Sequence, residues 1–138
     1  MAQGHSVRGE PMSPWTFASF AASEGVKTSM HDLLRFVHFQ MNEQAHALSS
    51  VLLRTQEKLE VSDYNKRFFA GKGWHIIERK KFYPTIAHTG STSGFRSFIG
   101  FVPETQTAVI LLCNSESTTG GLGYHILRML NNNWKKKK

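Results

Sequence analysis

The stretch that decides the fold runs from His88 to Asn114 and reads HTGSTSGFRSFIGFVPETQTAVILLCN. Two of its segments, 98–102 and 108–112, are rich in apolar residues, many of them aromatic or β-branched, which favour strands. Residues 103–106, Pro-Glu-Thr-Gln, lie between these segments and have turn chemistry. The two segments are therefore predicted to pair as an antiparallel hairpin.

Small and polar residues open this stretch. Gly90 and Gly94 have no Cβ, so a ligand backbone can approach them closely, or the strand can bulge there. Thr89 and Ser91 supply hydroxyl groups, and His88 supplies a ring nitrogen that changes protonation near neutral pH. A strand that opens on these residues is expected to line a cleft with its edge. The alternative is a solvated loop of Ser, Thr and Gly that leads into a strand.

Upstream, two prolines and two glycines predict loop or extended structure over residues 1–20. Ser29, with Asp32 three places later, is typical of a helix N-terminus, where the serine side chain accepts a backbone N–H and the helix dipole favours the carboxylate. An apolar stripe at helical spacing follows, formed by Leu33, Phe36, Val37 and Met41. This pattern predicts a helix that packs on a core rather than one that carries chemistry.

The remaining elements follow from the same kind of pattern. In chain order they are a helix over 43–57, a loop over 60–67, strands over 73–78 and 82–87, and a closing helix over 121–130 that stops at Asn131-Asn132-Asn133. Pro84 restricts the strand over 82–87 to a sheet edge or an irregular connection.

Several motifs recur in a fixed order along the chain. They are AASEGVKTSMHDLLRF at 21–36, GKGW at 71–74, HTG at 88–90, GF at 94–95, IGFVP at 99–103 and CNS at 113–115, followed by a Gly-rich helix start. Their order and spacing resemble the C-terminal part of the penicillin-recognising serine hydrolases. The similarity is greatest to the branch that contains class C β-lactamases, D-alanyl-D-alanine carboxypeptidases and esterases.

The resemblance implies an α+β fold with an antiparallel sheet, a C-terminal covering helix and a helical N-terminal half, which is an incomplete β-lactamase/transpeptidase-like fold. It divides the chain into an irregular and helical segment over 1–67, antiparallel strands with a closing helix over 68–134, and a basic tail over 135–138. An uncovered sheet edge is also expected, with self-association as its consequence.

The resemblance also assigns roles along one strand. His88, Thr89 and Gly90 match the third motif of these enzymes, which is usually Lys-Thr-Gly in β-lactamases and often His-Thr-Gly in peptidases and esterases. The backbone amide of Ser91 matches one of the two oxyanion-hole donors. The implied ligand is an acyl substrate, such as a D-alanyl peptide, a β-lactam or an ester, bound in extended form along the strand edge.

The catalytic motifs of this family are absent from the sequence. No serine is followed by Lys three places later, and no tyrosine is followed by Asn two places later, so neither Ser-x-x-Lys nor Tyr-x-Asn occurs. The chain is therefore predicted to be a C-terminal portion that is inactive alone. Two alternatives stay open: a partner chain or N-terminal fragment supplies the missing motifs, or the chain is a non-catalytic ligand-binding module.

Composition argues against other classes of function. The net charge is +7, but four of these charges belong to Lys135–Lys138, and no basic stripe interleaved with aromatics predicts nucleic-acid binding. The seven histidines have no zinc-site spacing, and neither a metal nor a cofactor is expected. No apolar stretch is long enough to predict a membrane span. The sequence leaves the location undecided, although the family is commonly periplasmic or secreted in bacteria.

Overall fold

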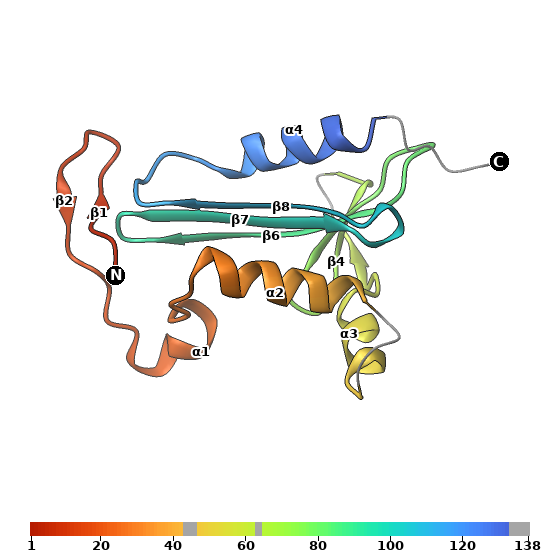
Figure 1. Cartoon of the computed structure of the whole chain (residues 1–138), viewed down its shortest axis with the longest axis horizontal. Helices are drawn as coiled ribbons and strands as arrows, with labels where there is room; N and C mark the ends of the chain where they lie inside the picture. The colour runs from red at the N-terminus through yellow and green to blue at the C-terminus, as the bar shows by residue number, and fades with distance from the viewer. Residues whose placement is uncertain (43–46, 63–64, 133–138) are drawn as a thin grey trace.

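A computed structural model describes residues 1–42, 47–62 and 65–132 of the chain (Figure 1). In chain order its elements are β1 (Gly4–His5), β2 (Pro11–Met12), the 3-10 helix η1 (Ala18–Phe20), α1 (Ala21–Glu24), α2 (Met30–Met41), α3 (Ser49–Thr55), β3 (Glu60–Val61), β4 (Phe68–Ala70), β5 (His75–Ile77), β6 (Thr85–Thr92), β7 (Phe95–Val102), the 3-10 helix η2 (Pro103–Thr105), β8 (Thr107–Cys113) and α4 (Gly120–Leu130).

Six strands form one antiparallel sheet in the order β3-β4-β5-β6-β7-β8. The hairpin predicted around residues 103–106 is confirmed, because β7 and β8 pair from Val102↔Thr107 to Arg96↔Cys113 with η2 as their connection. β8 is the last strand in this order, so within the described residues its outer edge has no partner strand.

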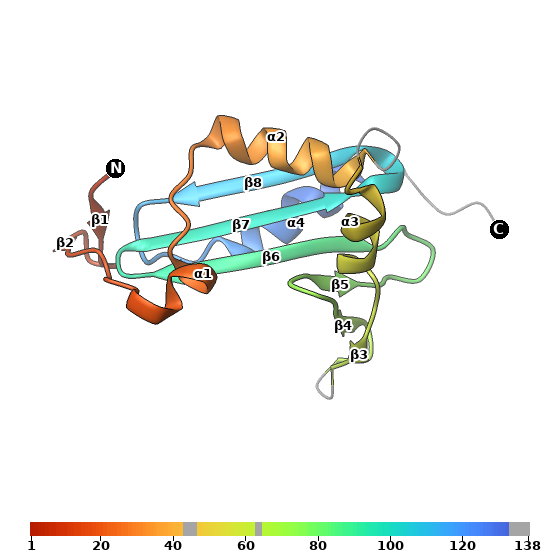
Figure 2. The same cartoon turned by 90° about the horizontal axis from the view of Figure 1, so that it is seen from below.

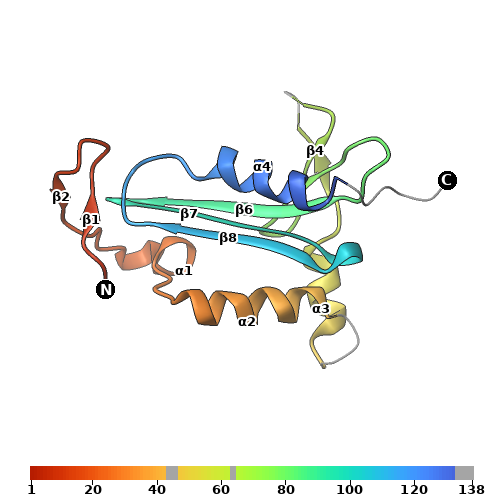
Figure 3. The same cartoon turned by 45° about the horizontal axis from the view of Figure 1, so that its top comes forward.

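Helices cover both faces of the three long strands, β6 to β8 (Figures 1 and 3). α4 packs on β7 and β8 from one side, and α2 packs on the same two strands from the other. Because side chains alternate between the faces of a strand, Phe98 and Phe101 of β7 enter different cores. The core under α4 contains Ala87, Phe98, Val102, Val109 and Leu127, and the core under α2 contains Val37, Trp74, Ile76, Ile86 and Phe101.

The predicted start of α2 is confirmed. The Ser29 hydroxyl oxygen accepts the backbone N–H of Asp32 at 3.2 Å, and the same hydroxyl donates to the Asp32 carboxylate at 2.7 Å. The hydrogen bond from Ser29 lowers the pKa of Asp32, since it stabilises the charged carboxylate. Of the predicted stripe, Val37 is fully buried, because it faces the sheet directly.

Three expectations about the elements were wrong in detail. The loop predicted over 60–67 contains β3, because pairing with β4 overrides its polar composition. The strand predicted over 82–87 begins only at Thr85 and extends to Thr92, and Pro84 lies in the irregular connection before it, one of the two places predicted for it. The helix predicted over 43–57 is α3, and residues 43–46 lie outside the described residues.

The N-terminal segment contains more structure than its composition predicts. β1 and β2 form a short hairpin, and the N–H of His5 donates to the carbonyls of Gly94 at 3.2 Å and Asn114 at 3.0 Å. Gly94 has φ of +73°, and a Cβ there would lie 2.7 Å from the Gly4 backbone. The N-terminal segment therefore holds the end of the sheet where the β6–β7 turn lies.

The fold is of the α+β class, as predicted, with an antiparallel sheet and a covering helix, α4. The division of the chain near residue 67 stays a prediction, although β3 and α2 from the first part join the sheet and its core. The predicted basic tail, 135–138, lies outside the described residues.

Candidate functional site

The predicted site residues lie on one half of β6 that has a neighbour on one side only. β5 pairs with Thr85, Ile86 and Ala87, and this register ends at Ala87, whereas β7 pairs with β6 as far as Thr92. Figure 2 shows β6 continuing well beyond the short β5. Within the described residues, the edge of β6 over 88–92 is therefore open on the β5 side, so the strand lies inside the sheet at one end and forms an edge at the other.

The direction of the amide groups follows from the turn between β6 and β7. Thr92 pairs with Phe95 across the two residues Ser93 and Gly94. The residues that flank a two-residue hairpin turn of this kind form a hydrogen-bonded pair. Because hydrogen-bonded and non-hydrogen-bonded pairs alternate in antiparallel strands, Ser91↔Arg96 is a non-hydrogen-bonded pair. We infer that the N–H of Ser91 faces the open edge, which is where an extended ligand would need it.

The side chains of this half-strand divide between the two faces. Thr89 and Ser91 share the face that carries α4, and a Cβ on Gly120, the first residue of α4, would lie 3.2 Å from the Thr89 methyl carbon. Gly90 is on the other face, where a Cβ would clash with the Ser97 hydroxyl. His88, Thr89 and Ser91 are exposed, so their polar groups are accessible.

A second histidine joins this edge, and the sequence analysis missed it. The His75 ring stacks on His88, with ring centroids 5.2 Å apart and an interplanar angle of 23°, and it also contacts Phe68. Partial desolvation lowers the pKa of His75, and repulsion from a charged His88 lowers it further. The sequence indicated that His75 lies in one predicted strand and that His88 opens the next stretch. It did not indicate that the two rings meet, because this depends on how the strands pair.

The lowered pKa of His75 predicts a pH dependence of stability. Its pKa is near 6.5 in the unfolded chain and lower in the folded one, so the unfolded state binds the proton first. The resulting loss of unfolding free energy is absent above the unfolded pKa of His75 and grows as the pH falls through 6.5 towards the folded pKa. His75→Gln is therefore expected to reduce the loss of unfolding free energy between pH 7.5 and pH 5, as measured by urea denaturation. An unchanged or steeper loss in His75→Gln would contradict this.

Neither of two hollows found in the described part of the chain coincides with the open edge. One, of about 370 Å³, lies beside α4, and the other, of about 1090 Å³, lies on the side of α2 and α3. His88, Thr89, Gly90 and Ser91 line neither of them. A strand edge binds an extended chain through its own amide and carbonyl groups and needs no closed cavity, so the fact that neither hollow reaches residues 88–91 is compatible with a site there.

The described part of the chain holds neither a cluster of metal-binding side chains nor a helix that could span a membrane. Among residues 1–42, 47–62 and 65–132, no three or more His, Cys, Asp or Glu side chains are grouped so that they could hold a metal ion. In the same part of the chain, every helix is too short or too polar to cross a bilayer. The candidate site therefore consists of backbone groups, hydroxyls and two imidazoles.

Comparisons with known proteins agree with the fold. The structure of the octameric penicillin-binding protein homologue from Pyrococcus abyssi is similar, with a TM-score of 0.73 and 18% sequence identity over 95% of this chain. This chain spans 31% of the length of that protein, so its fold is a partial β-lactamase/transpeptidase-like fold. A search of curated proteins gives no match. The family model described as Beta-lactamase matches residues 2–131, and the chain therefore belongs to the β-lactamase family of serine hydrolase-like proteins.

Proposed function

We propose that this chain is the C-terminal portion of a β-lactamase-like serine hydrolase and supplies one wall of its acyl-transfer site. In this proposal, the open edge of β6 binds the acyl substrate in extended form, and the N–H of Ser91 donates to the developing oxyanion. Thr89 and His88 contact the polar groups of the substrate. The chain has no hydrolase activity alone, because it contains no Ser-x-x-Lys or Tyr-x-Asn sequence.

One observation carries the proposal. Among the residues that the structure describes, β6 is paired with β5 only as far as Ala87 and then runs on to Thr92 with its β5-side edge free, and the side chains of His88, Thr89 and Ser91 are exposed there. An unpaired strand edge of this kind is a binding surface for an extended chain, because the amide and carbonyl groups of that chain can continue the sheet ladder. β-Lactams, D-alanyl peptides and esters are the proposed substrate classes, and the match to the family model described as Beta-lactamase supports the first of them.

A second chain that supplies the nucleophile is favoured by a separate feature, the outer edge of β8. This strand ends the sheet within the described residues, and Leu112 on it is 45% exposed. An apolar edge strand without a partner tends to pair with another strand. We therefore propose that an N-terminal segment, from the same protein or from a partner, docks there and completes the enzyme.

The test is acylation with and without the missing motifs. The purified chain is incubated with a chromogenic ester and a fluorescent penicillin, followed by intact mass. The same assay is repeated after adding the N-terminal segment of a β-lactamase family protein that carries both motifs. We expect no turnover and no adduct with this chain alone, and an adduct on the added segment in the mixture.

The matched control is the same added segment with its nucleophilic serine replaced by alanine, which should form no adduct. A stable adduct on this chain, lost in His88→Ala, would mean that a nucleophile within these 138 residues performs the chemistry and would overturn the proposal of inactivity. Saturable binding of a D-alanyl peptide without any acylation in the mixture would instead favour a non-catalytic binding module.

A further inference from the structure

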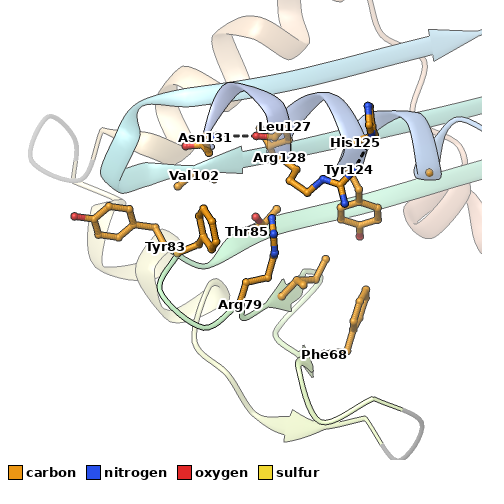
Figure 4. Close-up of a pocket in the computed structure, with 13 residues that line it drawn as sticks. Phe68, Arg79, Tyr83, Thr85, Val102, Tyr124, His125, Leu127, Arg128 and Asn131 are labelled. Carbon is orange, nitrogen blue, oxygen red and sulfur yellow. Dashed lines mark hydrogen bonds between the residues drawn. The ribbon is translucent and has the colours of Figure 1, made fainter. Parts of the chain in front are cut away.

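A pocket on the face that carries α4 has no role in the proposed function. Its volume is about 370 Å³, within the range of small-molecule sites. One wall is α4, through Tyr124 and Arg128, and the other is the β5–β6 connection, through Arg79, with Phe68 of β4 lining it as well. Figure 4 shows these side chains around one space. The pocket shares no lining residue with the half-strand 88–92.

The two arginines that line this pocket, Arg79 and Arg128, carry the same charge, and no acidic side chain lines it. The ion pairs found in the described part of the chain, His31 with Asp32 and Lys58 with Glu78, lie elsewhere and involve neither arginine. Two guanidinium groups at one pocket without a carboxylate form a site for an anion.

Both arginines are held in place by other contacts and still have free donors. The guanidinium of Arg79 lies over the Phe82 ring, 4.5 Å from its centroid, and this contact helps to hold the side chain in place. Nη2 of Arg128 donates to Nδ1 of His125 at 2.8 Å. A guanidinium has five N–H donors, so this bond leaves Arg128 with others for a ligand.

Apart from Thr85, His125 and Asn131, the rest of the pocket is mostly apolar and aromatic. Phe68 and Tyr124 contact each other edge to face, with ring centroids 6.4 Å apart, and Leu127 of α4 is part of the core between this helix and the sheet. A hydrated inorganic ion has no apolar surface to bury against these aromatic walls, so it is not the ligand that fits the pocket best. A ligand that fits both parts has an anionic head and an apolar body.

We propose that this pocket binds a small amphiphilic carboxylate. Its head is held by the guanidinium groups of Arg79 and Arg128, and its aromatic or alkyl body lies against Phe68 and Tyr124. A carboxylate matches the planar fork of each arginine, and the pocket volume is sufficient for a body of a phenylalkyl group. The site bridges α4 and the β5–β6 connection, so binding also stabilises the contact between them.

Isothermal titration calorimetry of the 138-residue chain with 4-phenylbutyrate tests the proposal. Saturable binding is expected, with no binding of the neutral 4-phenylbutyramide and much weaker binding of inorganic phosphate. Arg79→Gln and Arg128→Gln should each weaken binding roughly tenfold or more, since each removes a charge-assisted hydrogen bond. Arg54→Gln, on exposed α3 and outside the pocket, is the matched control and should bind normally.

Arg79→Lys and Arg128→Lys keep the charge but lose the planar fork, and they guard against loss through misfolding. Both are expected to keep the unfolding midpoint of the original chain and to show weakened binding. Equal binding of the amide and the carboxylate would overturn the proposal, as would equal binding by the Arg→Gln variants and the original chain. Phosphate binding as tight as that of 4-phenylbutyrate would overturn the role of the apolar walls.

Discussion

Replacement of Phe98 by alanine is expected to lower the free energy of unfolding by about 3–5 kcal/mol, the usual range for a large aromatic in a core. The Phe98 side chain is 1% exposed and lies in the middle of β7. Its ring meets Tyr124 of α4 edge to face, at 4.9 Å between centroids, and packs directly against Gly123. Alanine would leave a cavity between the sheet and α4, and urea denaturation followed by circular dichroism would measure the loss.

The chain offers a matched control for this change. Phe20 is the same residue type but is 71% exposed, so Phe20→Ala should change the free energy of unfolding by less than about 0.5 kcal/mol. A small domain has a total stability of about 5–15 kcal/mol, so the loss at Phe98 would be a large part of it. A loss below about 1 kcal/mol at Phe98 would mean that α4 does not pack on β7 as described.

Sequence signals that act over a few residues predicted the fold best. The start of α2 was predictable because Ser29 and Asp32 are three residues apart and bond to each other without help from the rest of the chain. The β7–β8 hairpin was predictable for the same reason, since its turn begins at Pro103. The helix α4 followed from an apolar stripe whose most buried member is Leu127.

Structural features that depend on partners far apart in the sequence were harder to predict or were missed. For residues 88–92, composition alone left a strand and a solvated loop of Ser, Thr and Gly both open, and only the pairing with β7 along their whole length decides for the strand. β3 exists only because β4 pairs with it. The contact of His5 with Gly94 and Asn114 joins segments about 90 and 109 residues apart, which no local pattern predicts.

The candidate site shows the same division. The motif at 88–91 identified the strand from sequence, because a few residue types in a fixed order were sufficient for the resemblance. The register that ends β5 at Ala87, and so opens the edge, required the paired strands. The stacking of His75 on His88 required them as well. The roles of His88, Thr89, Gly90 and Ser91 in binding stay predictions.

In the mixture of this chain with an N-terminal segment that carries the catalytic motifs, Ser91→Pro is expected to slow acylation by the fluorescent penicillin about 10²–10³-fold. Proline has no N–H, so it removes one of the two proposed oxyanion donors, and loss of one such donor has an effect of this size. The β6–β7 ladder should survive, because Ser91↔Arg96 is inferred to be a non-hydrogen-bonded pair whose amides face away from each other. The acylation rate constant is measured by stopped-flow fluorescence.

Ser91→Ala separates the amide from the side chain. It keeps the N–H and removes only an exposed hydroxyl, so its acylation rate should stay within a few-fold of the original. A Ser91→Pro chain that keeps its unfolding midpoint but loses acylation would assign the donor to the backbone. Equal losses in both variants would place the effect in the hydroxyl, and no loss in either would mean that β6 supplies no oxyanion donor. The direction of the Ser91 N–H depends on the β6–β7 register, because a shift by one residue would turn this amide towards β7. The two variants therefore also test the register of β6.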